Sequence, residues 1–374
     1  MRGFVEQLKS NIKQLKHDVG CRLALRRGIR PKSVRDGPLP LEFDFYVSSE
    51  KGLFHVDSNG IRRLSSIPMY GVALTEDHVF MAGQIHKRSV VLRGDRRRNE
   101  PLEMRNPTIL YETMAQGYNE RIHQINHGMG SIWVANTGRN SILQIDPASG
   151  EVTTEIWPFT DDFSQKIIAD QNHINSVHAY GDFIVFTAYT AGDGSLIGVI
   201  DADMNVTGFR HENMGIHDIY LEPDNFYFCD TFGNRDSEFG GSQITRNGPY
   251  APEIFQKPPG YITRGIAKSG NQLVIGHSHK GTRSQRFKGN GSLLLFIEDE
   301  FHSEIQMPCA QIYQMVRSDG LNFDGSTQSM KLSEVIGMFT EHLGSPIYSK
   351  PADCMDYRQV SKGSPGRLWR MPYG

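Results

Sequence analysis

Two histidines occupy the same place in two similar stretches of the sequence. His123 lies nine residues before Ile132, and His217 lies nine residues before Phe226. Histidine accounts for only 14 of the 374 residues, so its recurrence at one position is informative. Neutral imidazoles that converge on one point are the ligands that a borderline-soft divalent ion binds. The pair therefore predicts a divalent metal site, with zinc as the expected ion.

Two further histidines are candidates for the same site. His173 aligns with the first pair if its unit carries one extra turn residue, and otherwise Asn175 takes that position. His277 ends the second strand of a later unit, from which it would face the same mouth. Histidines that cap strand ends or form hydrogen bonds in a wet channel would give the same pattern. Both hypotheses stay open for the metal candidates His123, His173, His217 and His277.

Three other side chains suit catalysis beside such an ion. Tyr70 and Arg264 occupy the aligned position in their own units, and Asp218 directly follows the second histidine. A carboxylate there would hold a ligand histidine or act as a base, and Tyr70 is the alternative base. Arg264 would bind a carboxylate or phosphate of the substrate through its planar fork. These roles describe a lyase or hydrolase in which the ion polarises a substrate oxygen or activates water.

The elements that must position these residues recur along the chain. Each copy contains a short strand, a turn and a second strand, and similar copies occupy residues 121–137, 173–188, 215–231 and 262–278. The units repeat at about 45–50 residues, the range of four-stranded propeller blades. They begin near Tyr70, Ile122, His173, Ile216 and Ile262. Their first strands would line a central channel, with the candidate site residues converging on its axis.

A sixth blade closes the predicted ring. The strands that begin at Phe43 have no first strand of their own, and the strand over 310–316 has no strand after it. Pairing the two ends of the chain would remove both exposed sheet edges. We therefore expect an all-β fold, a six-bladed β-propeller closed by pairing of the N- and C-terminal strands.

Two extensions flank the predicted propeller, which spans residues 41–318. Residues 1–40 form an N-terminal amphipathic helix and a linker, because apolar residues recur at helical spacing among lysines and arginines. Residues 319–374 form a C-terminal extension with a helix over 331–343 and an irregular tail. The basic helix over 1–30 would pack on the main domain or on a second subunit. Peripheral contact with an anionic membrane is the alternative.

Composition limits the classes of partner. The formal net charge is −2, so nothing in the whole chain favours nucleic acid. We find neither a secretory leader nor a run of about 18 apolar residues that would span a membrane. The four cysteines are widely separated and form no zinc or redox motif. These features predict a cytoplasmic protein that acts on a small-molecule substrate, and they leave its oligomeric state open.

The units over 43–316 resemble the NHL and gluconolactonase-like class of six-bladed propellers, in GIHDIYLEPDNFYFCDT and SIWVANTGRNSILQID. More narrowly, His217, Asp218, Asp224, Asp230 and the run LVIGHSHKG around His277 resemble zinc-ligand segments of the peptidyl-hydroxyglycine alpha-amidating lyases. That resemblance implies zinc held by three propeller histidines, with a catalytic tyrosine and arginine. Those lyases are secretory and disulfide-bonded, features that this sequence lacks. NHINSV at 172–177 is similar to an uncharacterised bacterial propeller family found near glycan biosynthesis genes.

Two classes of function remain open from the sequence. One is a metal-dependent lyase or hydrolase that acts on a small, anionic substrate at the mouth of the central channel. The other is a non-catalytic propeller that recognises a protein or a glycan on its top face, for which the histidines are incidental. The metal content of the protein and the properties of the His217→Ala variant would separate the two.

Overall fold

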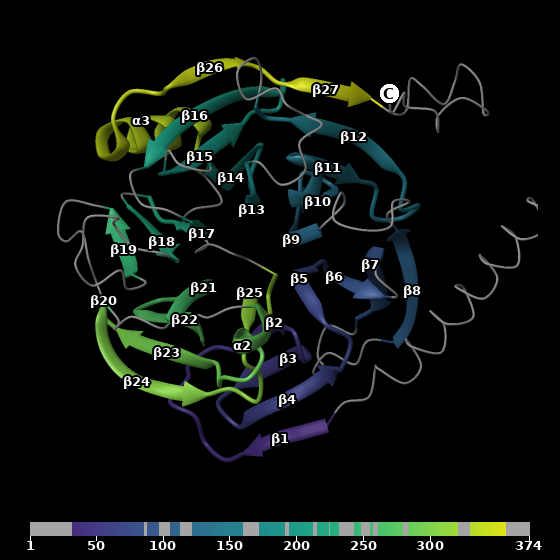
Figure 1. Ribbon diagram of the computed structural model, residues 1–374, viewed down its shortest axis with the longest axis vertical. Coiled ribbons are helices and arrows are strands. Elements are labelled where there is room, and N and C mark those ends of the chain that lie inside the picture. The colour runs from purple at the N-terminus through teal and green to yellow at the C-terminus, as the bar shows by residue number, and fades with distance from the viewer. Residues whose placement is uncertain are drawn as a thin grey trace, which may run out of the picture.

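The computed structural model describes residues 32–85, 88–96, 105–112, 122–159, 172–190, 194–211, 215–223, 225–231, 243–247, 255–256, 261–279, 283–320 and 330–356. Within these residues the strands pair into six antiparallel sheets. Figure 1 shows the sheets arranged around one axis, with one strand of each sheet nearest to it. The all-β propeller predicted from the repeats is therefore confirmed.

Three sheets contain the first half of the chain and both of its ends. The first joins β25 (Ile312–Arg317), β2 (Phe45–Ser49), β3 (Gly52–Asp57), β4 (Gly60–Ser65) and β1 (Lys32–Asp36). The second joins β5 (Met69–Leu74), β6 (His78–Ile85), β7 (Arg88–Asp95) and β8 (Arg105–Glu112). The third joins β9 (Ile122–Gly128), β10 (Ser131–Asn136), β11 (Ser141–Ile145), β12 (Val152–Trp157) and β27 (Asp353–Asp356).

The other three sheets follow in chain order. The fourth joins β13 (Ile174–Tyr180), β14 (Phe183–Thr190), β15 (Gly194–Ile200), β16 (Asn205–His211) and β26 (Tyr348–Pro351). The fifth joins β17 (Ile216–Leu221), β18 (Phe226–Asp230), β19 (Gln243–Asn247) and β20 (Phe255–Gln256). The sixth joins β21 (Tyr261–Ser269), β22 (Gln272–His279), β23 (Ser292–Ile297) and β24 (Glu300–Gln306). In each sheet the first strand named here is the inner strand.

The ring closes as predicted, by pairing of strands from the two ends of the propeller. β25 pairs antiparallel with β2, from Phe45 opposite Arg317 to Ser49 opposite Ile312. The Ser48 hydroxyl also accepts a hydrogen bond from the Gln314 amide nitrogen at 3.0 Å. The late strand thereby supplies the inner strand that the first strands lack, which leaves no open edge at the axis.

The hydrophobic core lies between neighbouring sheets. Six clusters of buried side chains each join two adjacent sheets, and one of them packs Trp133 of β10 with Phe186 of β14. Alternate side chains of a strand point to opposite faces, and in a ring each face meets a neighbour. Both sets are therefore buried, and the run from Phe183 to Phe186 is at most 1% exposed at every position.

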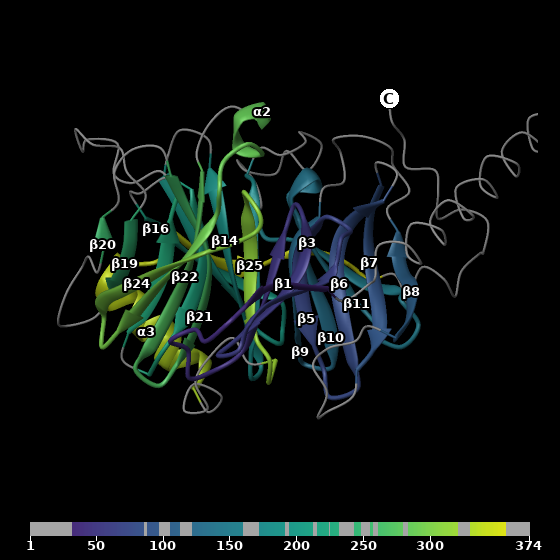
Figure 2. The same cartoon turned by 90° about the horizontal axis from the view of Figure 1, so that it is seen from below.

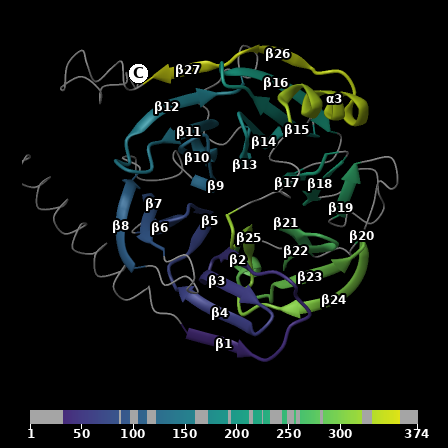
Figure 3. The ribbon, with the colours of Figure 1, turned by 180° about the vertical axis from the view of Figure 1, so that it is seen from behind.

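The C-terminal extension contains the expected helix but is not an irregular tail. Helix α3 (Leu332–Leu343) packs Val335 and Phe339 against the fourth and fifth sheets, where Phe339 contacts Phe209 and Phe226. After α3, β26 pairs with β16 and β27 pairs with β12, so the expected irregular course is wrong over these strands. Figure 3 shows both strands along the outer rim of their sheets.

One further sequence prediction concerns residues that the structure does not describe. The N-terminal amphipathic helix expected over 1–30 lies outside the described residues. Among the helices that the structure does describe, none is long and apolar enough to cross a membrane.

Candidate functional site at the axis

The inner strands share one irregularity. In each of the six, the pairing with the second strand shifts by one residue near the start of the strand. Such β-bulges bend a strand and redirect its side chains, and they are common beside functional sites. The shifts fall at Tyr70, at His123 and Gln124, at Asn175, at Asp218, at Arg264 and Gly265, and at Tyr313. Most of the candidate site residues therefore stand at these bulges.

A buried polar layer connects four of the bulges. The Gln124 side-chain amide donates hydrogen bonds to a carboxylate oxygen of Asp218 and, at 3.1 Å, to the backbone carbonyl of Tyr313. The other Asp218 oxygen accepts from the Gly265 amide nitrogen at 2.7 Å. These bonds join β9, β17, β21 and β25 across the axis. We call Gln124, Asp218 and Gly265 the axial layer.

Asp218 is fixed by the axial layer. It adopts a left-handed backbone conformation with φ 51°, which is uncommon for a residue other than glycine, and its side chain is 1% exposed. Burial raises the pKa of Asp218 to about 6, against the opposing effect of the Gly265 hydrogen bond. Because each of its oxygens accepts a bond from the protein, Asp218 is placed to hold the strands together. A role as the catalytic base would require one of these bonds to break.

His123 and His173 lie against each other. Their ring centroids are 5.0 Å apart, whereas the Asn175 side chain donates to the Ile216 carbonyl at 3.0 Å. The structure thus brings His173, and not Asn175, against the first histidine. The Thr137 hydroxyl donates to the Ile174 carbonyl, so its 2.6 Å contact with His123 Nδ1 makes that nitrogen the donor. A neutral His123 therefore carries its proton on Nδ1.

His217 is a buried, neutral member of the same cluster. It is 6% exposed, and its side chain forms no hydrogen bond with the residues that the structure describes. Burial lowers its pKa well below the ordinary value, and the positive charge of Arg264 lowers it further. His173 and His123 contribute in the same direction, which places all three imidazoles within electrostatic reach of one another.

Arg264 brings a buried positive charge to this cluster. Its Nε atom is buried and has no hydrogen-bond partner within the described part of the chain. Burial lowers the pKa of Arg264 to about 10, and the nearby charge of Arg286 acts in the same direction. No ion pair joins Arg264 to a carboxylate among the described residues, and the charge of Asp218 on the neighbouring sheet acts on Arg264 from a greater distance. A charged group in this state is an obvious binding point for an anion.

Arg286 comes from helix α2 (Arg283–Arg286), which lies between β22 and β23. The Gln311 side-chain amide donates to the carbonyls of Arg286 at 3.1 Å and of His279 at 3.0 Å. Figure 2 shows α2 projecting beyond one end of the sheets. Because the charge of Arg286 lowers the pKa of both His217 and Arg264, this basic segment stands over the end of the axis that holds the cluster.

Tyr70 joins the cluster from β5. Its ring centroid lies 6.3 Å from that of His123, edge to face, and 5.1 Å from that of Tyr313. The predicted residues Tyr70, His123, His173, His217 and Arg264 therefore gather at one place, which we call the axial cluster. Tyr313 belongs to it as well.

His277 does not share this position. It is 1% exposed, stacks on Tyr261 at a centroid distance of 4.3 Å, and places Nδ1 3.1 Å from the Ser292 hydroxyl. Glu304 lies 3.8 Å from the same nitrogen. These partners all belong to its own sheet, so the contacts describe a buried structural histidine.

The axial cluster does not fit a zinc ion. Structural and catalytic zinc sites use three or four ligands at about 2.0–2.3 Å. Among the described residues, no three histidine, cysteine, aspartate or glutamate side chains are placed to hold a metal. The positive charges of Arg264 and Arg286 would also repel a cation, whereas they favour an anion. The zinc hypothesis gains no support from this geometry.

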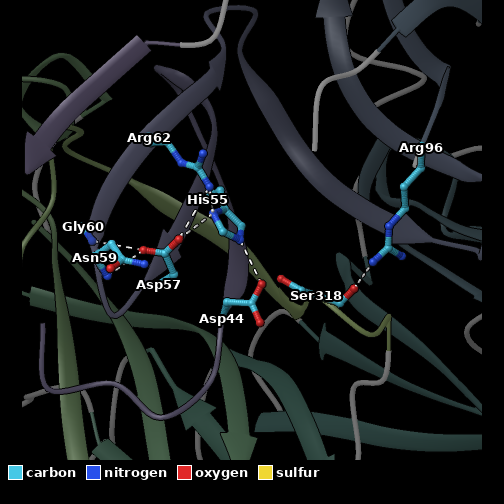
Figure 4. A network of polar contacts seen from close by, with 8 residues as sticks. All are labelled: Asp44, His55, Asp57, Asn59, Gly60, Arg62, Arg96 and Ser318. Carbon is cyan, nitrogen blue, oxygen red and sulfur yellow. Dashed lines mark hydrogen bonds and ion pairs between the residues drawn. The ribbon is translucent and has the colours of Figure 1, made fainter. Parts of the chain in front are cut away.

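A second cluster of histidine, aspartate and arginine lies on the first sheet (Figure 4). His55 Nε2 lies 3.0 Å from the Asp44 carboxylate, and Arg62 donates to His55 Nδ1 at 3.1 Å. Asp57 lies 3.5 Å from the same nitrogen. The hydrogen bond with His55 lowers the pKa of Asp44 to about 2. We call this group the His55 network, and sequence reasoning missed it.

Sequence reasoning also missed two members of the axial site. Gln124 follows His123 as Asp218 follows His217, so extending the alignment by one residue would have found it. Tyr313 lies on the closing strand, which had no second strand after it to set an alignment.

Comparisons with known proteins assign no family to the chain. No protein-family model matches the sequence, and the search of curated proteins gives no match. The resemblance to the amidating lyases is therefore not confirmed.

Solved structures resemble the chain only distantly. One is from a nidogen/laminin complex (TM-score 0.49, 10% identity, 75% of this chain and 99% of the other). Another is a protein of unknown function from Bacteroides caccae (TM-score 0.49, 11% identity, 74% and 98%). A third is hydrazine synthase from Kuenenia stuttgartiensis (TM-score 0.45, 14% identity, 76% and 92%). Similarity at this level assigns no activity, substrate or partner to this chain.

Proposed function

We propose that the axial cluster binds a small anionic substrate and carries out lyase or hydrolase chemistry on it, with Arg264 as the anion anchor and His217 as the base. The observation that carries the proposal is the buried Arg264 side chain, whose Nε atom has no hydrogen-bond partner among the described residues. A buried charge without a partner costs free energy, and a bound carboxylate or phosphate would remove that cost. The planar guanidinium suits such groups because it donates two parallel hydrogen bonds.

The electrostatics of the cluster select the sign of the ligand. Arg286 adds a second positive charge next to Arg264, and the three nearby histidines are neutral or positive. The one carboxylate in reach, Asp218, has both oxygens occupied by the axial layer. An anion is therefore the ligand that completes the charge balance.

His217 is the better candidate for the base. Its depressed pKa keeps the imidazole unprotonated at neutral pH, and an anion bound beside it would raise that pKa toward the range that suits a general base. His217 would take a proton from the substrate held by Arg264 in an elimination, or from a water molecule that attacks this substrate in a hydrolysis. Tyr70, 6.3 Å from His123 between ring centroids, is the candidate for the acid that protonates the leaving group.

A binding propeller without catalysis is the second candidate function. This function is favoured by Asp218, because both of its carboxylate oxygens already accept hydrogen bonds from the protein. The cluster is then left with His217 as its main candidate for a catalytic base. Both functions require an anion at Arg264. They differ in whether the bound molecule is converted.

Titration calorimetry with inorganic phosphate and with acetate tests the anion site. Arg264→Lys keeps the charge but loses the fork, so we expect affinity to fall about tenfold or more. Arg210→Lys, at an exposed position on β16, is the matched control and should bind like wild type. Equal binding by wild type and Arg264→Lys would refute the proposal.

The chemical step is tested separately. Wild-type protein and His217→Gln are incubated with a protein-free extract of small acidic metabolites, and products are followed by mass spectrometry. We expect turnover by wild type and a loss of about 100-fold or more in the variant, the usual range for a general base. Binding without turnover by both proteins would favour the non-catalytic function.

A further inference from the structure

A cavity of about 330 Å³ opens beside the axial cluster. Tyr70 and Tyr313 form its inner wall, and Phe287 lies at its outer side. The turn between β2 and β3, the residue before β5 and the end of β6 complete the lining, with Glu50, Lys51, Pro68 and Gln84. The closing sheet, the second sheet and the segment after α2 therefore contribute to one space.

The cavity lies next to the anion anchor. Gln124 donates to the backbone carbonyl of Tyr313 and to Asp218, and Asp218 accepts from the amide nitrogen of Gly265, the residue directly after Arg264. Tyr313 and Arg264 therefore stand at neighbouring bulges of one hydrogen-bonded layer, and the charge of Arg264 opposes the rise in pKa that burial causes in Tyr313. Tyr313 also lines the cavity, and Phe287 directly follows Arg286 in the chain. A molecule whose anionic group is held by Arg264 would therefore extend its remaining atoms into this space.

The residues that line the cavity indicate which kind of group the rest of the ligand forms. Tyr70 and Tyr313 present aromatic surface, and Phe287 is 47% exposed, although a phenylalanine side chain gains free energy from burial. Aromatic faces of this kind stack on rings. The volume is at the small end of ligand pockets, which hold about 300–1,000 Å³, so it accommodates a single ring.

Glu50 is the acidic residue of the lining, and both of its carboxylate oxygens are bonded to the start of the closing strand. Glu50 accepts hydrogen bonds from the backbone amides of Ala310 at 2.7 Å and Gln311 at 2.8 Å, one to each oxygen. Its charge is thereby partly compensated, and it supports the entry of the closing strand. Lys51 and Gln84 remain as polar groups at the edge of the cavity.

Resting on the anion-binding function proposed above, we propose that the substrate is a carboxylate or phosphate carried on one sugar ring or one aromatic ring. The ring lies in the cavity between Tyr313 and Phe287, and the anionic group lies on Arg264. Ring stacking then adds to anion binding, and the two contributions come from different residues.

Titration calorimetry with four probes tests this inference: D-glucuronate, benzoate, acetate and glucose. We expect one of the two ring anions to bind wild type about tenfold more tightly than acetate or glucose. Phe287→Ala should remove most of this preference and leave acetate binding unchanged. Phe301→Ala on β24 is the matched control, since Phe301 is also 47% exposed but lies away from the cavity.

The outcomes separate the two proposals. A preference for glucuronate supports a sugar acid, and a preference for benzoate supports an aromatic acid. Ring anions that bind no better than acetate, a preference that survives in Phe287→Ala, or no ring-anion binding up to roughly 10 mM would overturn the inference. If Arg264→Lys still weakens acetate binding in that case, the anion site stands alone. If Arg264→Lys changes nothing, the anion site itself is refuted.

Discussion

The His55 network and the axial cluster are built from the same residue types but are in opposite states. His55 is 4% exposed and His217 is 6% exposed, and each has an aspartate and an arginine nearby. His55 has partners on both ring nitrogens, as Figure 4 shows. His217 has no hydrogen-bond partner among the residues that the structure describes.

That difference separates a structural histidine from a candidate site better than residue type does. Buried polar groups are normally hydrogen-bonded, because leaving them unpaired costs roughly 1–3 kcal/mol each. The His55 network meets this rule within its own sheet. The axial cluster breaks it at the Nε atom of Arg264, so a bound molecule is the natural source of the missing partner.

The largest difference that we expect between the two groups is in the stability of their histidine variants. His55→Ala should lower the free energy of unfolding by about 3 kcal/mol, because it leaves a cavity and removes the partner of Asp44. His217→Ala also leaves a cavity but loses no hydrogen bond, so its loss should be smaller by about 1 kcal/mol. Urea unfolding of both variants measures this. Equal losses would mean that His217 is a structural residue like His55.

A smaller effect concerns Asp218 and pH. Its pKa is raised to about 6 in the folded protein, so the native state binds its proton more tightly than the unfolded state. The stability that Asp218 confers should therefore fall as pH rises, by about 2 kcal/mol between about pH 4.5 and 6.5. Asp218→Asn, which cannot titrate, is the reference. A difference between the two proteins that does not change over this range would show that Asp218 is not buried as described.

The smallest effect has the opposite sign and belongs to Asp44. The hydrogen bond with His55 lowers the pKa of Asp44 to about 2, so its contribution is present above the unfolded pKa and is lost as pH falls from about 4 to 2. Because its side chain is half exposed, we expect about 1 kcal/mol. Acid unfolding of wild type and of Asp44→Asn measures this contribution. A difference in stability between the two proteins that persists at about pH 2 would contradict the prediction.

The fold was largely predictable because its signals are local and repeat. Each inner strand is followed by a turn and a buried second strand, as in Ile216–Leu221 and Phe226–Asp230. The closing strand was predictable because it stood alone. The strands β26 and β27 were not, since YSKP and DCMD show no alternation and pair only because an open sheet edge lies beside them.

The site was predictable in part. His123, His173, His217, Tyr70 and Arg264 gather as the alignment indicates. The β-bulge that adds one residue to each inner strand leaves no recognisable pattern in the sequence. The structural role of the residue that follows each aligned histidine could therefore not be predicted. The position of His277 was misleading, since a matching place at a strand end does not determine which face a side chain occupies.

Anomalous X-ray diffraction tests the central claim most directly, because it identifies the kind of ion that the axial cluster binds. Crystals of the full chain are grown with selenate and a trace of zinc, and data are collected at the absorption edges of selenium and of zinc. We predict a selenium peak against the Arg264 guanidinium, toward Arg286, and no zinc peak between the imidazoles of His123, His173 and His217. A zinc peak held by these histidines, without selenate at Arg264, would contradict the account.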